Sequence, residues 1–381
     1  MTVVSNVMDN PSAFWVVNSL FVFALSVFCG GVLIPQILLI SFRKRLFDVP
    51  DERKIHQGVV PRLGGIAFKP VVFFSVALAL GLNMLLGYGQ LLGNIGSESR
   101  PLAFGFCTIM MLYLVGMADD LIGIRYRAKF AIQIICGLLV IAGGLWINNL
   151  HGLLFIHALP EWIGYPITLF AVVFIINAIN LIDGIDGLAS GLCGVAMLFY
   201  GLVFFIIGEY IYALLAFATL GVLVPFFYYN VFGDPAKKNK IFMGDTGSLT
   251  IGMMTCILSL KLLNGFPVNP SMQQPNAFFL AYSPLIIPCF DVVRVYLHRV
   301  RNGKNPFLPD KNHIHHKMLA VGMRQRTVMI AIVLVSVCFT LCNILLSRYI
   351  NVTLLLILDI FIWTLGNLWL TRRIHIAHSK L

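Results

Sequence analysis

The chain has 381 residues, of which 59% are hydrophobic and only 11% are charged, and its mean hydropathy is +0.89. A soluble domain carries about 25% charged residues. This composition therefore excludes a soluble globular protein and indicates an integral membrane protein. The formal net charge of +11 is compatible with a nucleic-acid partner or with a bias in membrane topology.

Apolar segments long enough to cross a bilayer recur along almost the whole chain. A transmembrane helix needs about 17–25 predominantly apolar residues, and we identify eleven such segments. They are centred near residues 27, 77, 110, 139, 171, 198, 220, 254, 286, 336 and 361. Only a short polar break around Glu209 separates the sixth from the seventh, so ten spans are the alternative. The sequence predicts an all-α, polytopic membrane bundle in which residues 1–381 form a single transmembrane domain.

The basic residues are distributed unequally between the two faces that eleven spans create. If the N-terminus is outside, every Lys and Arg except Arg100, Lys261 and Arg348 falls in an inside loop or at the inside end of a span. This bias follows the positive-inside rule. The positive charge is therefore a topology signal and gives no reason to expect nucleic acid. We predict an outside N-terminus and a cytoplasmic C-terminus.

With this topology, a group of acidic residues falls at or near the cytoplasmic ends of spans. The group comprises Asp119, Asp120, Asp183, Asp186, Asp245 and Asp291. Ionisable groups at membrane depth are costly and commonly mark functional sites. Because all of them are expected on one face, we predict one site there. The loops expected to build it are residues 43–65, 119–129, 181–187, 231–246 and 299–325.

Four motifs carry these acids and their polar neighbours. They read MADDLIGIRYRAK (117–129), NAINLIDGIDG (177–187), IFMGDTGSLTIG (241–252) and HRVRNGKNPFLPDKNHIHHKML (298–319). In the second motif, Asn177 and Asn180 have the i, i+3 spacing that places both on one helix face, and the Asp-Gly pairs that follow break the helix. In the third, Asp245 lies at a helix start, where free backbone N–H groups favour anions.

Each motif alone has a structural explanation, as a solvated loop, a turn, a helix cap or a basic loop. A zinc site at His313, His315 and His316 is one alternative, but carboxylates with Asn and no cysteine better suit a hard cation such as Mg²⁺, with Mn²⁺ as a second option. Mg²⁺ binds through one or two carboxylates together with substrate phosphates, and Lys129 adds positive charge for phosphate oxygens. The combination favours phosphoryl transfer between a water-soluble and a lipid-borne substrate.

Taken in order, the motifs resemble those of a known enzyme family. ERKIH, PRLGGIA, ADDLIGIRYRAK, NAINLIDGIDGLASG, FMGDTGS and HIHH together resemble the polyprenyl-phosphate N-acetylhexosaminyl-1-phosphate transferases over roughly residues 15–345. The resemblance implies transfer of a sugar-1-phosphate from a UDP-N-acetylhexosamine to undecaprenyl phosphate, with Mg²⁺ and release of UMP. It places the enzyme in the bacterial cytoplasmic membrane with its site facing the cytoplasm, where the product initiates cell-surface polysaccharide synthesis such as that of O-antigen.

The resemblance also implies a role for individual residues. The implied catalytic residues are Asp119, Asp120, Asp183 and Asp245. The implied substrate-binding residues are Lys129 at phosphate, Asp186 and Phe242 at uracil, Asn177, and His313, His315 and His316 at the sugar–phosphate end. Asp245 and Asn180 would ligate Mg²⁺, and Asp119 would be the base at the lipid phosphate. A phosphate monoester has a second pKa of about 6, so Asp119 has the alternative of positioning a lysine or the metal.

The loop PRLGG favours a branch of the family that uses UDP-N-acetylglucosamine over the branch that uses UDP-N-acetylmuramoyl-pentapeptide, because the latter typically has a threonine–methionine pair before the double glycine. UDP-GalNAc or another N-acetylhexosamine is a further alternative. A secondary transporter and an inactive binding protein are readings from other classes. Transporters often contain inverted repeats with a site at the membrane midplane, whereas the acids here are expected at one face. A homodimer is an additional option.

Overall fold

The computed structural model describes residues 11–46, 60–89, 95–265, 275–305 and 312–378. The long helices are α2 (Pro11–Lys44), α3 (Phe68–Leu85), α4 (Ile95–Ile122), α5 (Tyr126–Ala142), α6 (Glu161–Ile182), α7 (Leu188–Ile207), α8 (Tyr210–Val231), α9 (Gly244–Gly265), α11 (Ile286–Arg301), α13 (Gln325–Leu346) and α14 (Val352–His378). The short ones are η1 (Gly64–Ala67), η3 (Leu153–Phe155), η4 (Pro235–Lys237), α10 (Ala277–Tyr282), η5 (Ser283–Leu285) and α12 (Ile314–Ala320). The only β contact in the described ranges is an isolated bridge between Asn149 and Ala158.

Each of the predicted spans coincides with helical structure. Ten helical segments in the described residues are long and apolar enough to cross a membrane. The remaining prediction falls on α5, whose 17 residues lie at the lower end of the usual range of about 17–25. The prediction of an all-α, polytopic bundle is confirmed. Which face holds the N-terminus stays a prediction.

The sixth and seventh predicted spans are separate helices, so the merged alternative is wrong. Helix α7 ends at Ile207, Gly208 follows with φ 83°, and α8 begins at Tyr210. Glycine adopts this left-handed conformation without the steric penalty of a side chain, and it therefore commonly ends helices.

The ninth predicted span is not one continuous helix. Pro284 lies in η5 between α10 and α11, and proline lacks the backbone N–H that a continuous helix needs.

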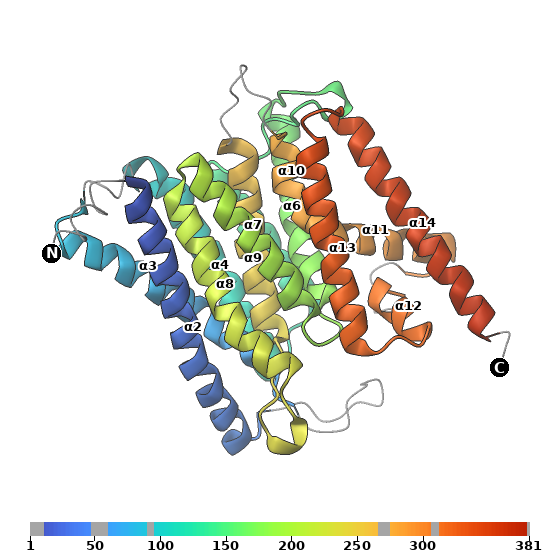
Figure 1. Cartoon of the computed structure of the whole chain (residues 1–381), viewed down its shortest axis with the longest axis horizontal. Coiled ribbons are helices and arrows are strands. Elements are labelled where there is room, and N and C mark those ends of the chain that lie inside the picture. The colour runs from blue at the N-terminus through green and yellow to red at the C-terminus, as the bar shows by residue number, and fades with distance from the viewer. Residues whose placement is uncertain (1–10, 47–59, 90–94, 266–274, 306–311, 379–381) are drawn as a thin grey trace.

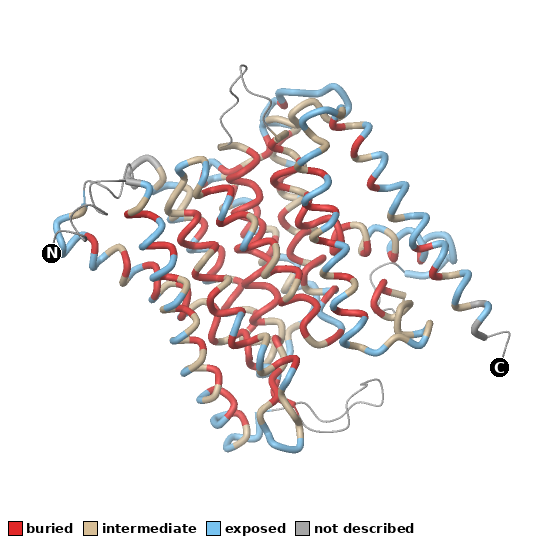
Figure 2. The backbone as a smooth tube through the Cα atoms, viewed as in Figure 1, coloured by how far each residue is buried: buried red, intermediate tan, exposed pale blue. Residues whose placement is uncertain are grey.

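Helix α9 lies at the centre of the bundle and contacts α4, α6, α7 and α10. Its whole membrane-spanning window is buried, and Figure 2 shows the buried backbone concentrated around it. The helix nevertheless contains several hydroxyl side chains. Thr250 donates to the carbonyl of Thr246 at 2.5 Å, and Thr255 donates to that of Ile251 at 2.7 Å. These side chains are satisfied within their own helix, which allows a polar helix to occupy a core position.

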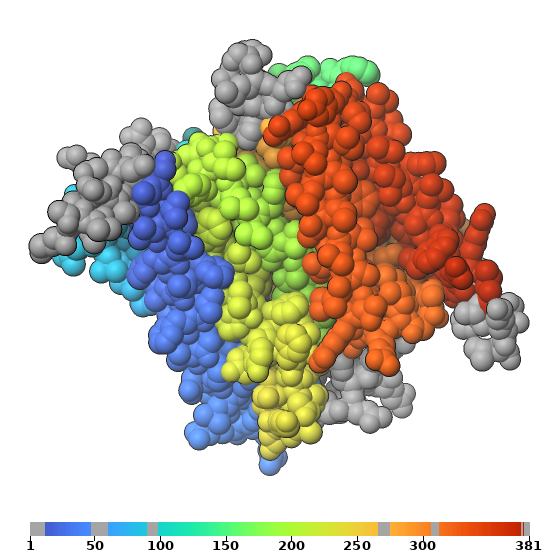
Figure 3. All heavy atoms as spheres, viewed as in Figure 1, coloured from blue at the N-terminus to red at the C-terminus, as the bar shows by residue number. Residues whose placement is uncertain are grey.

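The outer helices present apolar side chains on the molecular surface. Figure 3 shows α2, α7, α8 and α13 side by side on one face. Phe28 on α2, Leu334 on α13 and Phe361 on α14 are 68%, 57% and 57% exposed. Such exposure is unfavourable in water and suits contact with lipid. The bundle is therefore covered by lipid-compatible side chains around a more polar central helix.

Several helix ends meet at one end of the bundle, which faces the lower side of Figure 1. They are the C-terminal ends of α4, α6 and α8 and the N-terminal ends of α5, α7 and α9, with α12 beside them. We call this the site end. It brings together the described parts of the loops that the sequence analysis selected, whereas residues 47–59 and 306–311 of those loops lie outside the described residues.

Candidate active site

Asp119, Lys129 and Asp245 form a charged cluster where α4, α5 and α9 meet. The Nζ of Lys129 donates to Asp119 Oδ2 at 2.9 Å and to Asp245 Oδ2 at 2.6 Å. The other oxygen of Asp119 accepts the backbone N–H of Ile124 at 2.6 Å, which stabilises the turn between α4 and α5. Lys129 is 24% exposed. A single, partly accessible lysine thus bridges two carboxylates, and its ammonium group can also reach phosphate oxygens.

Asn180 joins this cluster from the last turn of α6. Its Nδ2 donates to Asp245 Oδ1 at 3.2 Å and to Ser248 Oγ at 2.8 Å. Both oxygens of Asp245 therefore have partners, one on α5 and one on α6. The two residues expected to bind Mg²⁺ are direct neighbours in the folded chain.

Asp120 lies beside Asp119 in sequence but holds the start of α9. Its Oδ1 accepts the backbone N–H of Asp245 at 2.8 Å, and its Oδ2 accepts both the N–H and the hydroxyl of Thr246 at 2.8 and 2.6 Å. A helix begins with N–H groups that have no partner in the helix. Asp120 satisfies two of them from another helix, so its immediate effect is to fix the backbone that carries Asp245.

Replacing Asp120 with Ala is therefore expected to destabilise the protein. Loss of a helix N-cap costs about 0.5–2 kcal/mol, and here the freed N–H groups are partly buried. We expect a lower midpoint of thermal unfolding in detergent, together with reduced binding of substrate at Asp245. An unchanged unfolding temperature would show that Asp120 does not cap α9.

The PRLGG segment also positions α9. Gly64 and Gly65 donate their backbone N–H groups to the carbonyls of Phe242 and Met243 at 3.0 and 2.9 Å, and Phe242 donates to the carbonyl of Pro61 at 2.8 Å. A Cβ on Gly65 would lie 2.0 Å from the backbone nitrogen of Gly247. The segment approaches the first turn of α9 so closely that only glycine fits.

Asp183 and Asp186 occupy the turn between α6 and α7. Asp186 Oδ2 is 2.5 Å from the Nζ of Lys240. Asp183 is exposed to solvent, and the carboxylates of Asp245 and Asp186 lie near it. The surrounding protein atoms and these negative charges raise the pKa of its carboxyl group. The turn therefore places one paired carboxylate and one carboxyl group with a raised pKa next to the Asp245 cluster.

The histidine cluster borders the same turn. His313 and His315 are buried, and their rings stack with centroids 5.8 Å apart. A Cβ on Gly184 would lie 2.2 Å from His315 Nε2, so the His315 ring packs directly on the chain between Asp183 and Ile185. Burial and the charge of nearby His316 lower the pKa of His315 to about 3, which keeps this ring neutral.

Two of the expected substrate-binding residues lie at the margin of this arrangement. Asn177 is one helical turn before Asn180, and its Nδ2 donates to Gln133 Oε1 at 2.7 Å and to the carbonyl of Val173 at 2.7 Å. Asn177 is thus engaged between α5 and α6 instead of with Asp245. Phe242 is half-buried on the segment that pairs with Pro61, two residues after Lys240. The roles of both stay predictions.

Comparison with known proteins adds an independent observation. Residues 102–263, which include the Asp119, Asn180 and Asp245 motifs, match the family described as "Glycosyl transferase family 4". The probable undecaprenyl-phosphate N-acetylglucosaminyl 1-phosphate transferase of Bacillus subtilis is 30% identical over 347 residues, which cover 89% of this chain and 88% of that protein. The chain belongs to this family.

Two further relatives of this glycosyl transferase family 4 protein carry related names. The undecaprenyl-phosphate alpha-N-acetylglucosaminyl 1-phosphate transferase of Yersinia pestis is 30% identical and covers 81% of this chain and 79% of its own length. The protein of the same name from Escherichia coli K12 is 31% identical and covers 76% of this chain and 74% of its own length. The similarity therefore extends well beyond the matched family segment.

Sequence reasoning did not select several residues of this family 4 site. They are Gln133, Asn230, Lys240, Ser248 and Arg294. Asn230, for example, accepts the backbone N–H of Gly187 at 2.7 Å and donates to the carbonyl of Ile241 at 2.8 Å, so it ties two site loops together. Asn230 and Ser248 lie in the last turn of α8 and the first turn of α9, so a polar residue at the end of an apolar span was the available signal for these two. Gln133 lies in the middle of α5, where its position gave no such signal.

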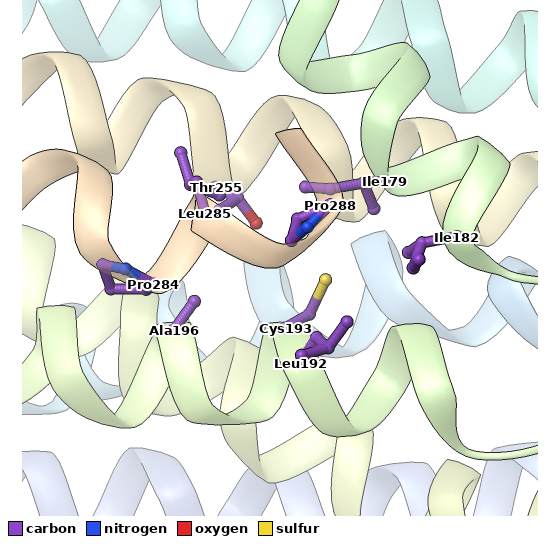
Figure 4. A pocket seen from close by; sticks show the side chains of 9 residues that line it. All are labelled: Ile179, Ile182, Leu192, Cys193, Ala196, Thr255, Pro284, Leu285 and Pro288. Atoms are coloured by element: carbon purple, nitrogen blue, oxygen red, sulfur yellow. The ribbon is translucent and has the colours of Figure 1, made fainter. Parts of the chain in front are cut away.

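The small pocket shown in Figure 4 is distinct from this polar cluster. It is lined by Ile179, Ile182, Leu192, Cys193, Ala196, Thr255, Pro284, Leu285 and Pro288. The Thr255 hydroxyl already donates to Ile251, so the lining offers an apolar surface and no cation. This pocket does not suit a phosphate group.

Asp245 and Asn180 supply the type of donor that Mg²⁺ prefers, namely a carboxylate and an amide oxygen. Among the residues that the structure describes, no group of three or more His, Cys, Asp or Glu is arranged to hold a metal ion. Two such protein donors suit a Mg²⁺ ion whose other ligands are substrate phosphates and water.

Proposed function

We propose that this protein transfers N-acetylglucosamine 1-phosphate from UDP-N-acetylglucosamine to undecaprenyl phosphate and releases UMP. The lipid-linked diphosphate sugar would initiate synthesis of a cell-surface polysaccharide. The observation that carries the proposal is the hydrogen-bonded cluster of Asp119, Lys129, Asn180 and Asp245, which four helices contribute at one end of a membrane bundle. The names of the relatives support the donor sugar and the acceptor lipid.

In the proposed reaction, an oxygen of the lipid phosphate attacks the β-phosphorus of the UDP-sugar. The bond from that phosphorus to the bridging oxygen breaks, and UMP leaves with the electron pair. Lys129 supplies positive charge to the phosphate oxygens, and Asp119 and Asp245 hold its ammonium group in place. When bound at Asp245 and Asn180, Mg²⁺ would neutralise charge on the diphosphate. The reaction proposed here is thus a single displacement, and the alternative is a path through a covalent intermediate on an aspartate.

The remaining residues fit the two ends of the donor. Asp186 and Phe242 would bind uracil by hydrogen bonding and stacking, and Lys240 orients the Asp186 carboxylate. His313, His315 and His316 would border the sugar–phosphate end, because His315 packs on Gly184 next to Asp183. The site end would face the cytoplasm of a bacterial inner membrane, where the UDP-sugar is available. Association into a homodimer stays a prediction.

An exchange assay tests the proposal. The purified protein receives undecaprenyl phosphate, labelled UDP-N-acetylglucosamine and Mg²⁺, and both UMP and lipid-soluble label are measured, with EDTA as the control. Turnover that EDTA abolishes supports the reaction and the metal together. Turnover only with UDP-GalNAc or with UDP-N-acetylmuramoyl-pentapeptide would show that the donor substrate is a different UDP-sugar. No turnover with any UDP-sugar would overturn the proposal and favour a transporter or a binding protein.

The same assay in membrane vesicles tests the orientation. Inverted vesicles expose the cytoplasmic face, so they should consume added UDP-sugar, whereas sealed right-side-out vesicles should not until detergent is added. The reverse pattern would place the site end outside.

Replacing Asp119 with Asn is expected to leave measurable activity that rises between pH 6 and pH 8. The second pKa of a phosphate monoester is about 6, so the acceptor itself becomes the better nucleophile over this range without a protein base. The variant also loses one charged partner of Lys129, which lowers activity at every pH. An Asp119→Asn variant without activity across the whole range would instead support a proton-abstracting role.

A further inference from the structure

Gln133 and Asn177 form a polar contact between α5 and α6 that the proposed transfer does not use. Asn177 Nδ2 donates to Gln133 Oε1 at 2.7 Å, and Gln133 Nε2 donates to Asn177 Oδ1 at the longer distance of 3.4 Å. The side chain of Gln133 is buried, with 2% of the residue exposed. The two amides thus satisfy each other inside the bundle, where an unpaired amide is costly.

The amide of Asn177 has no hydrogen left for a substrate. A side-chain amide carries two N–H donors. Gln133 accepts one of them, and the carbonyl of Val173 accepts the other at 2.7 Å. The oxygen of the same amide faces Gln133 Nε2. These contacts favour a role for Asn177 as a link between two helices, in place of the direct contact with substrate that the sequence analysis predicts.

This link lies one helical turn from the charged cluster on both helices. Lys129 precedes Gln133 by four residues on α5, which places both on one face of that helix. Asn180 follows Asn177 by three residues on α6, with the same consequence. Lys129 and Asn180 donate to different oxygens of Asp245. Helices α5 and α6 are therefore joined twice, once directly through the amides and once through Asp245.

Helix α5 has little else to fix its position along α6. Its buried residues form one narrow seam, made up of Gln133, Cys136, Gly137 and Val140. Apolar side chains in such a seam tolerate sliding, whereas a polar residue in an apolar helix interface specifies one register. The amide pair is also uncharged, so it fixes the register without attracting the ammonium group of Lys129 away from Asp245.

We propose that Gln133 and Asn177 are positioning residues whose amide pair sets the register of α5 against α6 and thereby places Lys129 and Asn180 on the two oxygens of Asp245. The inference rests on the proposed function for its effect on catalysis. A slip of α5 along its axis moves Lys129 by the same amount, and a misplacement of about 1 Å at a reactive group can cost about 10²-fold in rate.

The test uses one disrupting variant, one restoring variant and one control. Gln133→Met keeps the length of the side chain but removes both hydrogen bonds. The double variant Gln133→Asn with Asn177→Gln, which we call the swap, exchanges the two amides and keeps their combined length, so the pair can form again. Thr340→Val is the matched control, because Thr340 is buried on α13 and donates only within its own helix, to the carbonyl of Ser336 at 2.8 Å.

The register is measured in the absence of Mg²⁺ and substrate. Spin labels are attached at Leu138→Cys on α5 and Trp162→Cys on α6, two positions that are 53% and 76% exposed. The exposed cysteines are first replaced by serine, namely Cys107, Cys338 and Cys342. Double electron–electron resonance should give the same narrow distance distribution for the wild type, Thr340→Val and the swap. In Gln133→Met the mean distance should shift or the distribution should broaden.

The exchange assay measures the consequence for the site. Gln133→Met should lose about 10–100-fold in kcat and need about tenfold more Mg²⁺ for half-maximal turnover, as expected when a group that supports metal ligands is altered. The swap should recover most of both. A substitution that only reduced the amount of folded enzyme would lower turnover at an unchanged half-maximal Mg²⁺ concentration, and this is the most that we expect of Thr340→Val.

An unchanged distance distribution in Gln133→Met would overturn the proposal, and so would an unchanged Mg²⁺ dependence. If Gln133→Met fails to fold, the swap decides the question: wild-type distances and turnover in the swap support the amide pair, and any other result contradicts it. If the distances change as expected but the wild type turns over no UDP-sugar, the register role of the pair stands and the proposed function fails.

Discussion

Asp245→Asn is expected to lower turnover by about 10²–10³-fold, the effect of removing one preorganised electrostatic group from an active site. The substitution keeps the shape of the side chain but removes its negative charge. Lys129 then loses the closer of its two carboxylate partners, at 2.6 Å, and the proposed Mg²⁺ site loses its only carboxylate. Lys129 would no longer be held at the position where phosphate oxygens need it.

The measurement combines turnover with substrate protection. Mg²⁺ together with UDP-N-acetylglucosamine should raise the unfolding temperature of the wild type, because a ligand that binds only the folded state stabilises it. This shift should disappear in Asp245→Asn. Asp234→Asn is the matched control, since the Asp234 side chain caps η4 by accepting the N–H of Ala236 at 2.9 Å, away from the Asp245 cluster. Retention of more than about a tenth of wild-type turnover would contradict the role of Asp245.

Gly65→Ala is expected to destabilise the protein by about 3 kcal/mol or more, the upper end of the cost of overpacking a well-packed core. The added Cβ would lie 2.0 Å from the nitrogen and 2.2 Å from the Cα of Gly247. Both are backbone atoms of α9, so no side-chain rotation relieves the contact. The segment from Pro61 must move away from Met243 and break its backbone hydrogen bonds, and the start of α9 becomes disordered.

Thermal unfolding in detergent and the exchange assay measure this effect together. Gly81→Ala on α3 is the control, because a Cβ there meets no atom within 4 Å and alanine favours a helix over glycine by about 0.5–1 kcal/mol. We expect the control to be as stable as the wild type or slightly more so. Equal unfolding temperatures for Gly65→Ala and Gly81→Ala would show that the PRLGG segment does not clamp α9.

The transmembrane helices and the acids at their ends could be predicted from the sequence, because both depend on residues within a single segment. Long apolar runs require helices in a membrane, because only there are all backbone N–H and C=O groups satisfied within the segment. The acids at span ends could be selected for the same reason, since the bilayer penalises an ionised group without a partner. Asp119 and Asp245 are acids of this kind, whereas Lys129 and Asn180 belong to the motifs around them. The structure brings all four into one hydrogen-bonded cluster.

The same reasoning cannot distinguish an acid that faces substrate from one that supports the fold. Asp119 and Asp120 are adjacent in the sequence, but one pairs with Lys129 whereas the other caps a helix that begins more than a hundred residues later. Asn177 and Asn180 lie on one face of α6, but the side chain of Asn177 is hydrogen-bonded to Gln133. Which partner each side chain receives depends on helices that are distant in the sequence.

The membrane class, the positions of the spans and the kinds of group at the site follow from the sequence, because hydropathy and local spacing act within one segment. The central position of α9, the clamping of its start by Asp120 and the PRLGG segment, and the contact of Asp291 with His313 appear only in the folded chain. These are pairings between groups far apart in the chain. They are decided by which backbone N–H groups and charges remain without a partner after the helices pack.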